Sequence, residues 1–97
     1  MSERPTYKFR LYVAGDSPNS VHAKTNLKAF CQKYLPDQHE IEFVDVILEP
    51  RTALSERVFL TPTLFKLSPE PRRKIVGTLK EAGALREILG LPPELKV

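Results

Sequence analysis

Prolines mark several boundaries between secondary-structure elements in this chain of 97 residues. Pro18 follows a serine, and the pair is typical of a helix start, because the hydroxyl accepts from free amides and the first turn tolerates proline. Pro36 ends that helix, and Pro50 opens a second, shorter one. Pro69 and Pro71 are too close together for a paired strand, so they predict a turn.

The stretch before Pro18 alternates along its length, with the period of two that a β-strand requires. One face carries Tyr7, Phe9, Leu11 and Val13, and the other carries Lys8, Arg10 and Tyr12. Gly15 follows the strand, and a glycine at that point is ordinary turn chemistry. The sequence therefore predicts a strand, a turn and then a helix within the first third of the chain.

The remaining segments complete one small α/β domain over residues 1–97. Ile41 to Leu48 predicts a second strand, and its near-continuous apolar character is typical of a strand covered on both faces. Leu64 to Leu67 and Arg73 to Val76 predict an antiparallel hairpin, and a last helix is expected from about Lys80 to Leu89, before Gly90. The order β-α-β-α-β-β-α predicts a thioredoxin-like fold with a mixed four-stranded sheet.

The charge pattern does not indicate nucleic acid binding. The formal net charge is +3 and the pI is about 9.2, but basic residues are spread among twelve acidic ones. Only Arg72, Arg73 and Lys74 form a run, which is either a solvated edge or a partner-binding patch.

Neither a signal peptide nor a membrane-spanning run is predicted, so we expect a cytoplasmic protein without membrane contact. The polar start Met1 to Pro5 leads directly into the alternating strand. Cys31 is the only cysteine, which excludes an internal disulfide and leaves too few thiolates for a cysteine-built zinc site.

Redox chemistry is not expected, because the site that thioredoxin-like enzymes use contains no sulfur. Those enzymes carry Cys-x-x-Cys at the start of the first helix, where this chain has Ser17 to Ser20. Cys31 lies mid-helix and is interpreted as a core residue; the alternative is a glutathione-dependent enzyme with an exposed, acidic Cys31. His22 and His39 have no nearby group at metal-ligand spacing, so no metal or catalytic role is assigned to them.

Three positions are predicted to shape turns: Gly15, Pro18 and Pro62. Pro62 lies in a Thr-Pro-Thr segment just before the third strand, where thioredoxin-like folds characteristically carry a cis proline. From sequence alone the trans form remains the default.

Several motifs together resemble the KaiB family of clock proteins. They are Leu11 to Gly15, Ser17 to Val21, Val44 to Val46, Thr61 to Leu64 and Arg73 to Gly77, in the order and spacing of that family. The resemblance extends over about residues 6 to 80. From Leu79 onward the chain departs from cyanobacterial members.

The resemblance implies a clock or clock-derived adaptor without catalytic activity or cofactors. KaiB proteins bind the hexameric ATPase KaiC and modulate its phosphorylation state, compete with a sensor histidine kinase and help to sequester KaiA. The resemblance also implies a homo-oligomer, a dimer or a tetramer, and an alternative ground-state fold in which the C-terminal half is rearranged. A second hypothesis is a thioredoxin-like sensory or stress module that docks onto a histidine kinase or another partner, without a KaiC-driven oscillator.

The residues expected to contact a partner lie on the polar side of the first strand and on the basic hairpin. They are Lys8, Arg10, Tyr12, Lys66, Arg73 and Lys74. Charged rims of this kind mainly set association rate and register. Plain surface solvation is the alternative for each of them.

Overall fold

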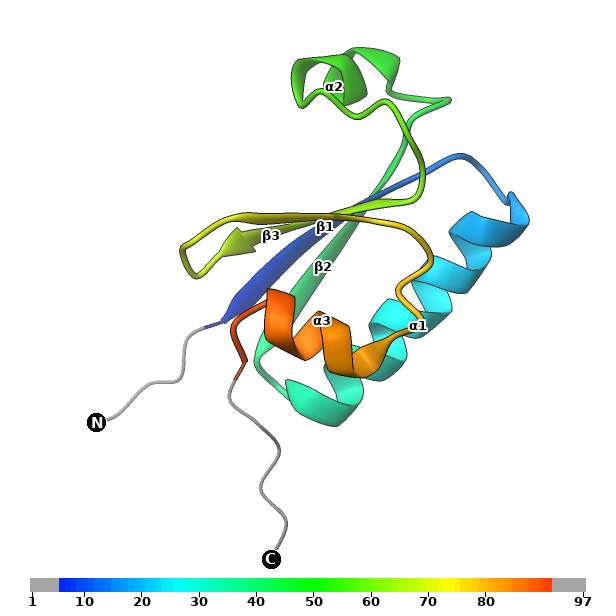
Figure 1. Ribbon diagram of the computed structural model, residues 1–97. Helices are drawn as coiled ribbons and strands as arrows, with labels where there is room; N and C mark the ends of the chain where they lie inside the picture. The colour runs from blue at the N-terminus through cyan, green and yellow to red at the C-terminus, as the bar shows by residue number, and fades with distance from the viewer. Residues whose placement is uncertain (1–5, 92–97) are drawn as a thin grey trace, which may run out of the picture.

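The computed structural model describes residues 6–91, which form four strands and three helices (Figure 1). In chain order they are β1 (Tyr7–Val13), α1 (Pro18–Tyr34), β2 (His39–Asp45), α2 (Pro50–Ser55), β3 (Thr63–Ser68), β4 (Arg73–Val76) and α3 (Ala82–Ile88). The predicted order of elements is confirmed.

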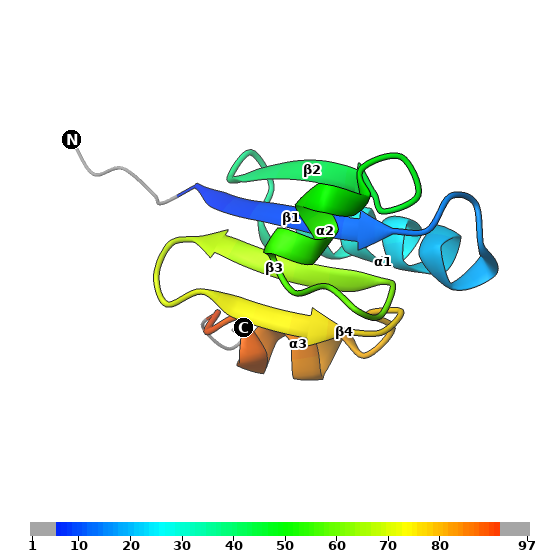
Figure 2. The ribbon, with the colours of Figure 1, turned by 90° about the horizontal axis from the view of Figure 1, so that it is seen from above.

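The four strands form one mixed sheet in the order β2-β1-β3-β4 (Figure 2). β1 pairs with β2 in parallel, as a right-handed crossover through a helix requires, and pairs with β3 antiparallel. β3 and β4 form the predicted antiparallel hairpin, with Lys66 opposite Arg73. This is the thioredoxin-like arrangement that the sequence predicts.

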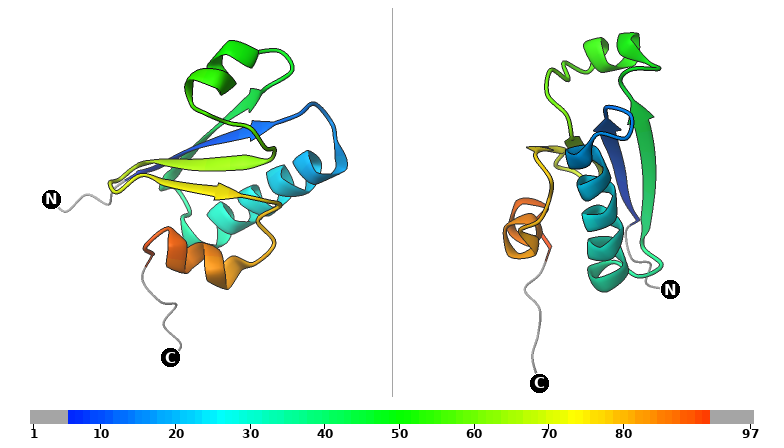
Figure 3. Two further views of the ribbon diagram at one scale, coloured as in Figure 1. Left: turned by 45° about the horizontal axis from the view of Figure 1, so that its top comes forward. Right: turned by 90° about the vertical axis from the view of Figure 1, so that its right-hand side faces the viewer.

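One face of the sheet is covered by α1 and α3, which lie on the same side in Figures 1 and 3. Every second residue of β1 points to this face, which contributes Phe9, Leu11 and Val13. The apolar side of α1 packs against these residues with Ala23, Leu27, Phe30 and Cys31. Leu85 of α3 and the flanking Leu79 and Leu89 complete the cluster. This face holds the larger of the two cores.

The short helix α2 covers the other face of the sheet, over β1 and β3 in Figure 2. Beneath it lies a second core of Tyr12, Val44, Ala53, Val58 and Phe65. The rings of Tyr12 and Phe65 meet edge to face, with centroids 5.6 Å apart. The α2 face of β1 is therefore buried at Tyr12, whereas Lys8 on the same face is exposed and Arg10 is half-buried.

The second strand is shorter than predicted and is an edge strand. It ends at Asp45, whose carboxylate accepts hydrogen bonds from the Ile47 and Gly15 amides at 2.9 and 3.2 Å. An aspartate that binds backbone amides in this way favours a turn over a continued ladder. Ile47 therefore leaves the sheet, and Phe43 within β2 is 38% exposed, so the prediction of a strand covered on both faces is wrong.

The start of the last helix and the isomer of the Thr61–Pro62 bond also differ from the sequence predictions. The last helix begins at Ala82, two residues later than expected, and Gly90 follows it with φ of 74°, a value that favours glycine. The Thr61–Pro62 bond is cis, unlike the trans default.

Candidate functional site

The β1–α1 junction, where a thioredoxin carries its two sulfurs, is built here from hydroxyl groups. The Ser17 hydroxyl donates to Ser20 Oγ at 2.9 Å, and that same oxygen accepts from the Ala14 amide at 3.0 Å. Gly15 turns the chain with φ of 53°, and Pro18 is the first residue of α1. These hydroxyl groups hold the backbone of the turn in place. They cannot carry out thiol–disulfide exchange, which requires sulfur.

Cys31 is a core side chain, and the interpretation made from its helical position is confirmed. Its side chain is fully buried in the α1–α3 core. Burial raises the pKa of the Cys31 thiol to about 12. A thiol that is both inaccessible and protonated at neutral pH is a poor nucleophile, which contradicts the glutathione hypothesis.

The two histidines take separate structural positions. His22 is exposed on α1, and His39 Nδ1 lies 2.7 Å from the Leu35 carbonyl at the start of β2. Within residues 6–91, no group of three or more His, Cys, Asp or Glu side chains is placed to hold a metal ion. None of the helices in that range is long and apolar enough to cross a membrane.

The six residues expected to contact a partner do not form one surface, because the pleat of the sheet divides them. On the face that α2 shares lie Lys8, Arg10, Tyr12 and Lys74. Lys66 follows Phe65 in β3 and Arg73 precedes Lys74 in β4, so both side chains point to the opposite face, which α3 covers. There Lys66 donates to the Leu89 carbonyl and Arg73 to the Ile88 carbonyl. A single partner patch of all six is therefore ruled out in this fold.

Two of the six are not accessible at all, which corrects the sequence prediction. Tyr12 is 0% exposed because α2 lies over it, and Lys66 is 3% exposed because the end of α3 lies over it. The alternation along β1 correctly assigned Tyr12 to the face of Lys8 and Arg10. It gave no information about the helix that covers one end of that face.

Arg10 links β1 to both neighbouring elements of the α2 face. Its Nε donates to Glu42 of β2 at 2.8 Å, and its Nη1 lies 3.9 Å from Glu56 after α2. Hydrogen bonding to the Glu42 carboxylate raises the pKa of Arg10. Glu56 also pairs with Arg72 at 3.3 Å, so this carboxylate joins β1 to the β3–β4 turn.

An electropositive groove of about 340 Å³ lies between the end of α2 and the β3–β4 hairpin. Its floor is the ring of Phe65, with the Arg72 guanidinium 5.6 Å and the Lys74 ammonium 5.8 Å from the ring centroid. Lys74 also donates to the Arg57 carbonyl at 3.3 Å. The lining residues are Ser55, Glu56, Arg57, Phe65, Arg72, Arg73 and Lys74. The guanidinium of Arg73 is directed to the α3 face, so the groove is bordered by the charges of Glu56, Arg57, Arg72 and Lys74.

The segment around α2 carries several exposed apolar side chains, which the sequence analysis did not identify. They lie just before, within and after α2: Ile47, Leu48, Leu54, Phe59 and Leu60, each 65 to 77% exposed. We call these five residues the α2 apolar patch. One signal was present in the sequence: the run Val58 to Leu60 offers more apolar surface than one two-turn helix can cover.

Comparison with known structures supports the fold. The N-terminal domain of Synechococcus elongatus SasA superposes with a TM-score of 0.74 over 99% of this chain and 94% of that chain, at 19% identity. Mitochondrial thioredoxin 3 of Saccharomyces cerevisiae gives a TM-score of 0.69 over 91% and 81%, at 20% identity. At such low identity these likenesses establish the thioredoxin-like fold and nothing more.

Comparison of sequences establishes the family. The circadian clock oscillator protein KaiB of Prochlorococcus marinus is 38% identical over 91 residues, 94% of this chain and 76% of that protein. Circadian clock protein KaiB3 of Synechocystis is 36% identical, over 88% of this chain and 83% of that protein. The family model of the KaiB domain matches residues 10–91, which extends beyond residue 80, where the motif resemblance ends. The chain is therefore a member of the KaiB family of circadian clock proteins.

Proposed function

We propose that this protein is a non-catalytic cytoplasmic adaptor that binds a KaiC-like hexameric ATPase and modulates its phosphorylation state. The α2 apolar patch is the observation that carries the proposal. Five large apolar side chains within 14 positions leave most of their surface in water, outside the two cores. A patch of this kind is typical of a surface that a protein partner covers.

The neighbouring groove supports a partner with acidic groups around an apolar contact. Arg57, Arg72 and Lys74 line this groove, and Glu56 is already engaged by Arg72 and Arg10. Charges at the rim of an interface speed association and set its register, whereas apolar anchors at its centre supply most of the affinity. We therefore assign anchoring to Phe59 and steering to Lys74.

An enzymatic role is not part of the proposal. The positions that hold sulfur in thioredoxins carry Ser17 and Ser20, and the thiol of Cys31 is buried with a raised pKa. An adaptor of this kind works by occupying a surface of the ATPase, so it needs exposed complementary side chains and no reacting group.

The test is a sedimentation-velocity titration against the KaiC-like ATPase of the same genome, with ATP present and incubation over hours. We expect a stoichiometric complex with the wild type. Phe59→Ser and Lys74→Glu should each weaken it, the first by about tenfold or more because it removes an apolar anchor. Lys74→Glu should act mainly on the association rate and lose its effect at high salt.

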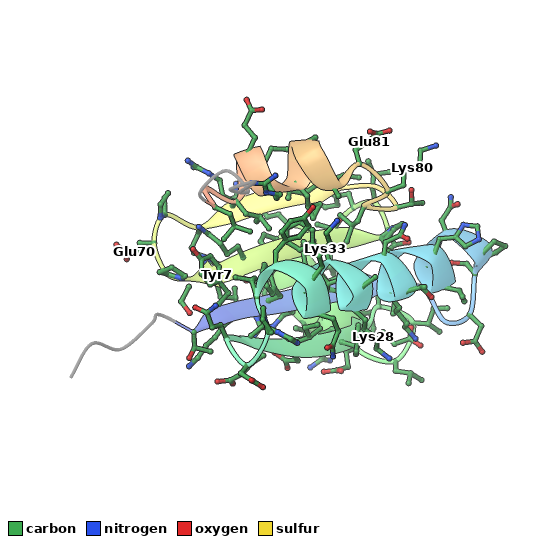
Figure 4. The ribbon with its side chains drawn as sticks, turned by 90° about the horizontal axis from the view of Figure 1, so that it is seen from below. Tyr7, Lys28, Lys33, Glu70, Lys80 and Glu81 are labelled. Carbon is green, nitrogen blue, oxygen red and sulfur yellow. The ribbon has the colours of Figure 1, made fainter. Side chains whose placement is uncertain are left out.

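Matched controls lie on the α3 face. Ile88→Ser removes an exposed apolar side chain and Lys80→Glu reverses an exposed charge, both away from α2 (Figure 4 shows Lys80 beside α3). Neither should change the affinity. Equal weakening by a variant and its control would contradict the assignment of the α2 face. If no complex forms with the ATPase and one forms with a histidine kinase, the sensory-module hypothesis replaces this one.

A further inference from the structure

A small cavity lies at the end of the sheet where β1 begins; it shares Arg73 with the groove between α2 and the β3–β4 hairpin. It has a volume of about 120 Å³, and its walls are the first residue of β1, the β3–β4 turn and the end of α3. The lining residues are Tyr7, Lys66, Pro69, Glu70, Pro71, Arg73, Leu89 and Gly90. Figure 4 shows Tyr7 and Glu70 at this end of the molecule.

Lys66 brings a buried positive charge to the cavity. The residue is 3% exposed, and its ammonium donates to the Leu89 carbonyl at 3.1 Å and lies 5.7 Å from the centre of the Tyr7 ring. An ammonium has three N–H donors, and within residues 6–91 this carbonyl is its one hydrogen-bond acceptor. A buried ammonium with unfilled N–H donors is stabilised by an additional hydrogen-bond acceptor, especially an anionic one.

Arg73 adds a second cation on the same side of the hairpin. It is the cross-strand neighbour of Lys66, and its Nε donates to the Ile88 carbonyl at 3.3 Å. Burial and the charge of Arg73 both lower the pKa of Lys66, as expected where two cations face one cavity.

No acidic group in the described part of the chain balances these two charges. Among residues 6–91, neither Lys66 nor Arg73 has a carboxylate within 4.0 Å. Glu70 is the acidic residue of the cavity wall; it is exposed, and Figure 4 shows its side chain directed outward from the turn. Within residues 6–91, the cavity therefore combines excess positive charge with unused donors.

We propose that this cavity is a binding site for a small oxyanion of the phosphate type, held between Lys66 and Arg73. Its volume corresponds to roughly four water molecules, which suits a tetrahedral oxyanion. The anion neutralises two cations that already hold the last carbonyls of α3. Its binding therefore tightens the attachment of α3 to the hairpin, on the face opposite the α2 apolar patch.

The test is a titration of the full chain with inorganic phosphate, followed by 15N–1H correlation NMR at constant ionic strength. We expect saturable, one-site shifts of the amides of Tyr7, Glu70, Leu89 and Gly90. Arg73→Gln should weaken the affinity by about tenfold or more, because a charged hydrogen-bond donor is lost. Arg73 is exposed, so this variant should retain the fold.

Two further variants complete the experiment. Lys66→Met removes the buried charge and should abolish the saturable shifts, whereas Lys80→Gln removes an exposed charge elsewhere and should leave them unchanged. Phosphate should also raise the unfolding temperature of the wild type more than that of Arg73→Gln. Shifts that do not saturate, or equal affinity in the wild type and Arg73→Gln, would overturn the proposal. The outcome is independent of ATPase binding, because the α2 apolar patch is not involved.

Discussion

Alkaline pH should destabilise this protein through the ionisation of Cys31. The ordinary pKa of this thiol is 9.0, and burial in the α1–α3 core raises it to about 12. Between these values the unfolded chain loses the thiol proton and the native protein keeps it. The native state then binds more protons, so the free energy of unfolding falls as the pH rises. At neutral pH both states are protonated, and this contribution is constant.

The size of the effect follows from the two pKa values. Each pH unit in this window costs about 1.36 kcal/mol, which gives a loss of about 1.4 kcal/mol at pH 10 and about 2 kcal/mol at pH 10.5. Other groups titrate in the same range, so the wild type must be compared with Cys31→Ala. Alanine leaves a small cavity, whose cost does not depend on pH.

The assay is urea unfolding of both proteins between about pH 7 and about pH 10.5, followed by far-ultraviolet circular dichroism. The wild type should be the more stable protein at neutral pH. Its advantage should shrink by about 2 kcal/mol over this range. Parallel stability curves would mean that the native thiol ionises normally and is accessible, and they would reopen the glutathione hypothesis. Labelling of native Cys31 by a thiol reagent should be slow and should accelerate in urea.

Three other predictions concern the α2 face and the buried lysine. Tyr12→Ala should lower the free energy of unfolding by about 3 to 5 kcal/mol because it leaves a cavity in the core beneath α2. Leu54→Ala, on the exposed side of that helix, should change the free energy of unfolding by less than about 0.5 kcal/mol. Urea unfolding measures both values. A double-mutant cycle of Arg10 and Glu42 should give a coupling below about 1 kcal/mol that decreases with added salt, since both side chains are partly exposed. The pKa of Lys66 is lowered in the fold, so the unfolded chain binds the ammonium proton more tightly than the native protein does. The wild type should therefore gain stability relative to Lys66→Met as the pH rises toward 10.5. Urea unfolding at several pH values tests this.

Local sequence patterns predicted most elements because each pattern reports a local physical preference. The alternation of β1 and the proline at the start of α1 both act within a few residues, and the structure agrees with them. The predicted end of the second strand was wrong at Asp45. The apolar run continues to Leu48, but the aspartate carboxylate binds two backbone amides and ends the strand. One of those amides, that of Gly15, is 30 positions away, so no local pattern contains this interaction.

The candidate contact residues were only partly predictable for a similar reason. The sequence placed Arg10 and Lys74 on strands with polar side chains outward, and the structure puts both at the surface near α2. Tyr12 and Lys66 are buried by helices that lie far away in the sequence. The α2 apolar patch was missed because Ile47 and Leu48 were assigned to a covered strand and Phe59 and Leu60 to no element.

The sequence by itself determined the order of the elements, the family and the absence of a thiol pair at the redox position, because each depends on the identity and spacing of nearby residues. The tertiary structure alone decided which face of each strand is covered. A period of two separates the faces of a strand but does not say what packs on them. That depends on α2 and α3, whose positions follow from long-range packing, and it is what buries Tyr12, encloses Lys66 and leaves Phe59 exposed.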